Sequence, residues 1–236
     1  MPAEAGATVL AMTGFQEPHP DLIVPNPGGS DDPLGESVLD PAQPALRVFT
    51  PREVGVVIGR HQDPLREVDI AACQADGLPI HRRVSGGGTV VLAPGMVVVA
   101  LRLPNDRLGT SIWFDLINPH LVAAVRAAGG PELVTHRLGD LAVAGADGRI
   151  RKVLGASLRQ TSRIVVYLGV FLVDDAVPLM ERYLRHPSRE PDYRGGRNHR
   201  DFCVGLGRYG ITPERLITAI DHHLKTLGES PAAANQ

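Results

Sequence analysis

Short apolar runs alternate with amphipathic stretches over most of this chain. The runs are rich in β-branched residues and end at glycine, proline or a polar turn, which is the pattern of strands. Two of them, 96–103 and 164–173, are apolar almost throughout, so we expect these strands to be covered on both faces. The predicted strands lie at two places within 46–60 and at 96–103, 141–144, 150–154 and 164–173.

The amphipathic stretches predict helices, because their apolar residues recur every three or four positions. The expected helices are 63–76, 111–128, 177–184 and 213–227, the last with Thr212 as N-cap and Pro213 at its first position. A tight turn at Ala146-Asp147-Gly148 joins two strands directly as a hairpin. Hairpins between strands, with helices elsewhere, predict an α/β (α+β) domain with a mixed, largely antiparallel sheet flanked by helices.

The two ends of the chain lack these patterns. Residues 1–45 hold many of the prolines, with a breaker-rich stretch at 26–33, and predict an irregular N-terminal arm that does not pack tightly. Residues 46–227 are the predicted folded domain. Residues 228–236 are predicted to be a frayed tail.

Composition describes an ordinary globular protein. Of the 236 residues 43% are hydrophobic and 21% charged, and the formal net charge is −2, so no nucleic-acid partner is implied. We find no signal peptide and no apolar run long enough for a membrane helix, and therefore expect a cytoplasmic protein without a membrane partner. Two cysteines are too few for a disulfide framework and lack metal-site spacing.

The candidate chemistry begins at HRRVSGGGTVVLAPG, residues 81–95. Gly86, Gly87 and Gly88 form a loop without side chains, whose successive amides can make a concave anion site, and Arg82 and Arg83 add positive charge beside it. A phosphate or a carboxylate on an elongated molecule is the ligand that this predicts. A bare glycine triplet is equally compatible with a hairpin turn flanked by surface arginines. The string is neither a P-loop nor a dinucleotide fingerprint.

Lysine usage gives a second clue. Of the 24 basic residues only Lys152 and Lys225 are lysine. Lys225 lies near the end of the last predicted helix, where the helix dipole favours a cation. Lys152 lies on a predicted strand shortly before Gly155, where a compact ammonium can approach a carbonyl and a phosphate together, which the rigid fork of arginine does less well. We therefore expect Lys152 to be functional.

Read with RKVLGASLR at 151–159, the string R-R-x-S-G-G-G-T-V resembles the biotin/lipoate protein ligase superfamily, specifically its lipoate-protein ligase A and octanoyltransferase branch. Residues 59–64 are similar to the family's G-R-x-Q-N-P, and 139–141 to its N-D-L. The resemblance spans roughly 46–227. It implies a fold like that of class II synthetases and biotin ligases, with 46–227 as a lipoate ligase-like catalytic domain.

The resemblance also implies roles for residues. Lys152 would be catalytic, lying against the acyl carbonyl and the α-phosphate of an acyl-adenylate, and Arg83 would bind phosphate. ATP with Mg²⁺ would be the cofactors, lipoate the substrate and a lipoyl-acceptor protein domain the partner, with no metal ion held by the protein. The implied ATP or acyl-adenylate site is Arg83, Ser85, Gly86, Gly87, Gly88, Thr89, Val90, Val91, Asp140, Lys152, Gly155 and Ser157.

The sequence departs from the family pattern at several positions. Leu92 replaces a histidine after the triple glycine, Tyr167-Leu168-Gly169 replaces H-H-G, and Gly139 replaces the asparagine of N-D-L. The family's N-x-A-x-D-E helix is not recognisable in the arm. The chain ends where the bacterial ligase begins its small accessory domain, so we expect either a catalytic half that needs a separate accessory subunit or a transferase that needs no ATP.

Three functions therefore remain open, and we favour the first. A lipoate-protein ligase would activate lipoate, or a similar medium-chain acid, with ATP. An octanoyl or lipoyl transferase would use a cysteine nucleophile, for which Cys203 is the candidate, although a cysteine between Phe202 and Val204 is more often a core residue. A non-catalytic homologue would only bind acyl ligands or the acceptor domain. The arginine-rich stretch 186–202 is expected to be a solvated loop, with contact to a ligand or partner as the alternative.

Overall fold

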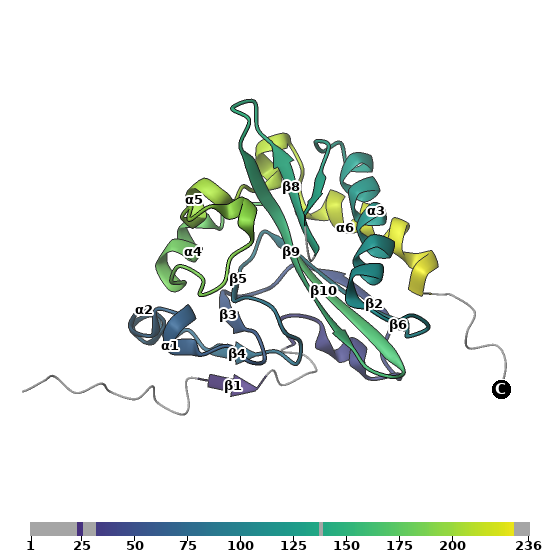
Figure 1. Ribbon diagram of the computed structural model, residues 1–236, viewed down its shortest axis with the longest axis horizontal. Helices are drawn as coiled ribbons and strands as arrows, with labels where there is room; N and C mark the ends of the chain where they lie inside the picture. The colour runs from purple at the N-terminus through teal and green to yellow at the C-terminus, as the bar shows by residue number, and fades with distance from the viewer. Residues whose placement is uncertain (1–22, 26–31, 137–138, 229–236) are drawn as a thin grey trace, which may run out of the picture.

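The computed structural model describes residues 23–25, 32–136 and 139–228. Its centre is a six-stranded sheet with the strand order β2-β6-β10-β9-β8-β7, in which every neighbouring pair is antiparallel (Figure 1). The strands are β2 (Leu46–Phe49), β6 (Met96–Pro104), β7 (Val134–His136), β8 (Asp140–Ala144), β9 (Ile150–Gln160) and β10 (Ile164–Leu172). The hairpin expected between 141 and 154 is β8 and β9.

A smaller sheet has the order β1-β4-β3-β5. Its strands are β1 (Ile23–Pro25), β3 (Gly55–Ile58), β4 (Ile80–Arg82) and β5 (Val90–Leu92). Strand β4 runs parallel to both β1 and β3, whereas β3 and β5 are antiparallel. The two strands predicted within 46–60 therefore belong to different sheets, and the prediction of a mixed, largely antiparallel α/β fold is confirmed.

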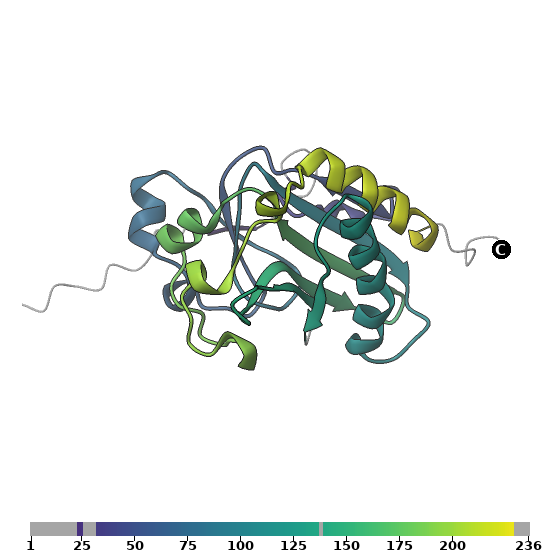
Figure 2. The same ribbon diagram turned by 90° about the horizontal axis from the view of Figure 1, so that it is seen from above.

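Two long helices, α3 (Thr110–Ala127) and α6 (Pro213–Gly228), cover one face of the large sheet (Figure 2). Both were expected from the sequence. The amide of Arg215 donates to Thr212 Oγ1 at 3.4 Å, which confirms Thr212 as the cap of α6. The core on this face joins residues of both helices to the sheet, among them Trp113, Ile117, Leu121, Leu216, Ile220, Val97, Val99, Tyr167 and Phe171. No helix in the described part of the chain is long and apolar enough to cross a membrane.

The opposite face of the large sheet packs on the small sheet, and the short helices lie on this side, the last three of them contributing to its buried cluster. These helices are α1 (Pro64–Glu67), α2 (Ile70–Ala75), α4 (Val177–Tyr183) and α5 (His199–Phe202). Val98 and Val170 of the large sheet lie in one buried cluster with Ile58, Ile80 and Val91 of the small sheet. Strands β6 and β10 are thus buried on both faces, as their unbroken apolar sequences predict.

The single helix expected over 63–76 is wrong. Val68 has φ −124° and ψ 141°, which is extended backbone, and it forms an isolated antiparallel bridge with Leu184. The side chain of Asp63 caps α1, and that of Asp69 caps a new helix, α2. A β-branched residue that pairs with a segment far along the chain therefore divides what the apolar spacing shows as one helix.

The expectation that the N-terminal arm does not pack tightly is wrong for residues 32–39. Leu34 and Val38 are buried, and a 3-10 helix (Glu36–Leu39) occupies this place. Arg102 of β6 ties it to the large sheet, since its Nη1 donates to the carbonyls of Val38 and Asp40. Residues 1–22 and 26–31, and the predicted tail from 229 on, lie outside the described residues.

Candidate functional site

The glycine loop between β4 and β5 takes its shape from Arg83. This side chain is only 5% exposed, and burial lowers its pKa to about 10. Its Nε and Nη2 donate to the carbonyl of Gly86 at 3.1 and 2.7 Å, and Nη2 also donates to the carbonyl of Gly88 at 2.6 Å. The guanidinium thus supports the loop from within, and the contact with phosphate that the family resemblance implies stays a prediction.

The loop amides are left for another partner. The carbonyl and N–H of a trans peptide point in opposite directions, so the N–H groups of Gly87 and Thr89 point away from Arg83. Among the described residues, no hydrogen bond is donated by the amides of Gly86, Gly87, Gly88 or Thr89. Unpaired amides on one side of a loop can bind an anion.

Only one of the three glycines is required by the fold. Gly87 has φ +94°, and a Cβ there would lie 2.9 Å from Arg83 Nη2. Gly86 and Gly88 have no such φ, and a Cβ on either would meet no atom within 4 Å. Nothing in the described structure explains glycine at these two positions, whereas close approach of a ligand to the backbone would.

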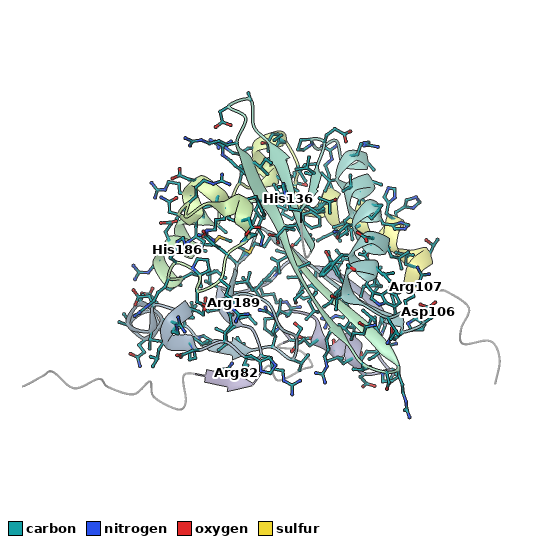
Figure 3. The ribbon with its side chains drawn as sticks, in the orientation of Figure 1. Arg82, Asp106, Arg107, His136, His186 and Arg189 are labelled. Atoms are coloured by element: carbon teal, nitrogen blue, oxygen red, sulfur yellow. The ribbon has the colours of Figure 1, made fainter. Side chains whose placement is uncertain are left out.

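The stretch 59–64 holds the loop from the side. Gln62 Oε1 accepts from the amide of Gly59 at 3.1 Å and from Thr89 Oγ1 at 2.8 Å. Arg82, labelled beside β4 in Figure 3, donates through Nη1 to the carbonyls of Gly59, Arg60 and Gln62. Both arginines before the glycines therefore bind main-chain carbonyls. The predicted residues Val90 and Val91 follow in β5, paired with Val57 and Val56 of β3.

Lys152 lies on the same face of β9 as Gly155 because β9 contains a bulge. Leu141 pairs with Leu154 but Ala142 pairs with Lys152, so Val153 is an extra residue in β9. The extra residue brings Lys152 onto the same face as Gly155, where a Cβ would lie 2.8 Å from Lys152 Nζ. Gly155 therefore leaves the room that the lysine occupies. Lys152 Nζ lies 2.7 Å from Asp140 Oδ1, and the lysine side chain stays 27% exposed.

The two halves of the predicted site meet. Ser157 lies two residues beyond Gly155 on the same face of β9, and its Oγ is 3.0 Å from Ser85 Oγ of the glycine loop. Ser85 is 1% exposed. The structure thus brings the loop residues 83–89 together with Asp140, Lys152, Gly155 and Ser157, which are far away in sequence.

A residue of the N-terminal segment also supports the loop, and the sequence did not point to it. The amide of Val84 donates to Glu36 Oε1 at 2.8 Å. Glu36 is 6% exposed and its charge favours the protonated form of Arg83. The sequence contains no signal for it, since Glu36 lies between a glycine and a serine in the irregular arm.

The arginine-rich stretch 186–202 is partly packed and partly exposed. Arg194 is 5% exposed, and Arg197 donates to the carbonyls of Ile150, Tyr193, Arg194 and Asp201. Between these arginines and the strand residues lies Tyr193, whose hydroxyl donates to Asp140 Oδ2 at 2.9 Å. The expectation of a solvated loop therefore fails for Arg194 and Arg197, whose guanidinium groups bind main-chain carbonyls, and holds for the exposed Arg189 and Arg200. Tyr193 was missed, since a tyrosine in a polar stretch carries no pattern of its own.

Cys203, the candidate nucleophile of the transferase alternative, lies beside Lys152 but is only 8% exposed. Its neighbour Val204 donates its amide to the carbonyl of Lys152 at 3.0 Å. Burial raises the pKa of the Cys203 thiol, and the opposing effects of Lys152 and Arg194 do not overcome it. A nucleophilic cysteine needs the reverse, an exposed thiol with a lowered pKa.

No three His, Cys, Asp or Glu side chains gather into a metal site within residues 32–136 and 139–228. Asp140 is the carboxylate of the candidate site, and each of its oxygens already has a partner, Lys152 or Tyr193. The site as it stands offers an ammonium and main-chain amides, which suit an anionic, phosphate-bearing ligand.

Comparisons with known proteins show the family of the chain. The chain belongs to the family of the lipoyl protein ligase A/B catalytic domain, whose family model matches residues 31–225. Among individual proteins, it is 24% identical over 191 residues to lipoate-protein ligase A of Blochmanniella pennsylvanica (strain BPEN). That match covers 72% of this chain and 55% of the relative, so the chain spans little more than half of the relative's length.

Solved structures share the fold. A bi-partite lipoate protein ligase from Thermoplasma acidophilum, studied with its E2 lipoyl domain, matches with a TM-score of 0.70 at 17% identity, over 87% of this chain and 81% of that one. A lipoate-protein ligase A bound with ATP matches with a TM-score of 0.67 at 17% identity, over 87% and 83% of the two chains. The family resemblance seen in the sequence is confirmed.

Proposed function

We propose that this protein is a lipoate-protein ligase. It activates lipoate, or a similar medium-chain acid, with ATP to an acyl-adenylate and transfers the acyl group to a lysine of a lipoyl-acceptor domain. The observation that carries the proposal is the meeting of two anion-binding elements across the Ser85–Ser157 contact. One is a glycine loop with unpaired amides, and the other is the ammonium of Lys152.

Lys152 is suited to stabilise the charge that develops on the reacting carbonyl and phosphate. An ammonium has three donors, and Asp140 occupies one of them through its contact at 2.7 Å. Because the ammonium is already ion-paired before the substrate arrives, little reorganisation is needed during the reaction. The loop amides of Gly87 and Thr89 supply further donors from the opposite side of the site.

ATP and Mg²⁺ enter the proposal together. Mg²⁺ is commonly held by substrate phosphates and one or two carboxylates rather than by a cage of protein ligands. Such an ion needs no dedicated cluster of protein ligands, since the ATP phosphates would bring it to the site. The partner we propose is a lipoyl-acceptor domain, consistent with the E2 lipoyl domain studied with the Thermoplasma ligase.

The test separates activation from transfer. The protein is incubated with lipoate and magnesium ATP, and pyrophosphate exchange into ATP is measured. An apo lipoyl domain is then added and its intact mass recorded, with and without a separately expressed accessory domain of a lipoate ligase. We expect lipoate-dependent exchange and a mass gain of one lipoyl group only when ATP is present.

Two other outcomes would decide against the ligase. Acyl transfer from an acyl-carrier thioester without ATP, with an acyl group retained on the protein, would establish the transferase. Binding of lipoate or of the acceptor domain without exchange or transfer, even with the accessory domain present, would establish a non-catalytic homologue.

A further inference from the structure

Tyr193 is connected to the candidate catalytic lysine through Asp140. Its hydroxyl donates to Asp140 Oδ2 at 2.9 Å, while Asp140 Oδ1 lies 2.7 Å from Lys152 Nζ. The carboxylate therefore joins a tyrosine on one oxygen to the lysine on the other. Burial and the nearby charge of Asp140 raise the pKa of Tyr193, so the phenol stays protonated and remains a donor.

The tyrosine ring is held from both sides. It stacks on His136 with the ring centroids 4.1 Å apart and packs against Phe202 at 5.0 Å. His136, labelled on the large sheet in Figure 3, is paired with Asp140 between β7 and β8. Arg194 and Arg197 both lie over the ring of Phe202, and Arg197 Nη2 donates to the carbonyl of Tyr193 at 2.7 Å.

The main chain and side chain of Lys152 are fixed by different groups. Its carbonyl accepts from the amide of Val204, and its strand is paired with β8, but only Asp140 contacts the ammonium among the described residues. A carboxylate can rotate about its bond to Cβ, so one contact does not fix where the ammonium lies. A second hydrogen bond on the other oxygen removes that rotation.

We propose that Tyr193 is a positioning residue that acts through Asp140 to fix the ammonium of Lys152. The inference rests on the proposed ligase function only for its activity assay. The arginine-rich stretch 186–202 then has a defined task, which is to hold the tyrosine ring against His136 and beneath the carboxylate.

The activity test uses Tyr193→Phe, which keeps the stacked ring and removes only the hydroxyl. We expect the kcat of lipoate-dependent exchange to fall about 10-fold, the effect of losing a residue that orients a functional group, while the KM values for ATP and lipoate stay within about twofold. Tyr183→Phe is the matched control, because that hydroxyl donates at 2.7 Å to Asp76, which is also paired with an arginine, Arg182. Its rates should match those of the wild type.

A double-mutant cycle identifies the route of the effect. If Tyr193 acts only through Asp140, then Tyr193→Phe causes no further loss in a protein that already carries Asp140→Asn. Losses that multiply in the double variant would overturn the inference, because a merely structural role is independent of the aspartate. An unchanged kcat in the single variant would overturn it as well.

A second readout needs no activity, so it separates failure of this inference from failure of the proposed function. The chain has two lysines, and Lys225 on the exposed side of α6 serves as an internal reference. An acylating reagent is added, and the labelling of the two lysines is compared by mass spectrometry. An ammonium held against a carboxylate must leave it before reacting, so we expect Tyr193→Phe to raise the Lys152 to Lys225 ratio about threefold or more. An unchanged ratio would contradict the inference whether or not exchange is observed, and Tyr183→Phe should leave the ratio as it is.

Discussion

The two halves of the candidate site are built in opposite ways. The glycine loop has no regular hydrogen-bonded ladder, and its shape comes from the side chains of Arg83, Arg82 and Gln62 bonded to its main chain or flanking residues. Lys152 lies on a strand whose main chain is paired on both sides, at this residue with Ala142 of β8 and with Cys203. A substitution in the loop half should therefore change its shape, whereas a substitution at Lys152 should change only its chemistry.

Replacing the lysine should give the largest effect on rate with little effect on folding. Lys152→Arg keeps the charge but replaces a compact ammonium by a planar fork above Gly155. We expect the rate of exchange to fall about 100-fold, which is the scale of losing one positioned donor. The free energy of unfolding should change by less than about 1 kcal/mol. Pyrophosphate exchange and urea unfolding measure the two quantities. A rate near that of the wild type would show that Lys152 is incidental.

Two alanine substitutions divide the loop half into shape and ligand contact. Gly59→Ala places a Cβ 2.1 Å from the carbonyl oxygen of Gly87, so the loop must move, at a cost of about 2–3 kcal/mol in urea unfolding. Gly86→Ala points a Cβ into open space and should leave stability within about 0.5 kcal/mol. If the open space is where a ligand lies, Gly86→Ala raises the KM for ATP. Unchanged kinetics in that variant would remove the argument for close approach at this position.

Acid should lower the stability of the folded protein through His199 of α5. Burial, with a smaller effect from Arg194, lowers the pKa of His199 from 6.5 to about 4. Between these two values the unfolded chain binds the proton and the folded one does not, so stability is lost as the pH falls through this window. We expect about 2 kcal/mol less stability at pH 5 than at pH 7.5 from this residue. His199→Gln should show a smaller loss, and an equal loss would assign the effect to other groups.

The smallest effect is expected at Cys203. Its thiol is buried and its raised pKa disfavours the thiolate, so Cys203→Ala should keep ATP-dependent acylation within about twofold and lose about 1 kcal/mol of stability from the smaller side chain. Intact-mass spectra of the wild type should show no acyl-enzyme. A folded Cys203→Ala protein that is inactive would indicate that Cys203 takes part in the reaction, and would favour the transferase.

The sequence predicts best what depends on local pattern. The long apolar runs became β6 and β10, the amphipathic stretches became α3 and α6, and the motif strings led to Ser85 and Lys152, which the structure places in one site. What could not be predicted depends on contacts between distant segments. Val68 interrupts a helix because it pairs with Leu184, and Tyr193 matters because the fold sets it under Asp140. Neither partner can be read from the residues nearby.

The bulge at Val153 decides which face of β9 the side chain of Lys152 lies on. Residues three apart on a regular strand face opposite sides, so Lys152 and Gly155 share a side only because one residue is inserted between them. Sequence redesign that removes the extra residue would give a more regular ladder, but it would place Lys152 on the opposite face of the strand from Gly155. The irregularity that a designer would correct first is the one on which the position of Lys152 depends.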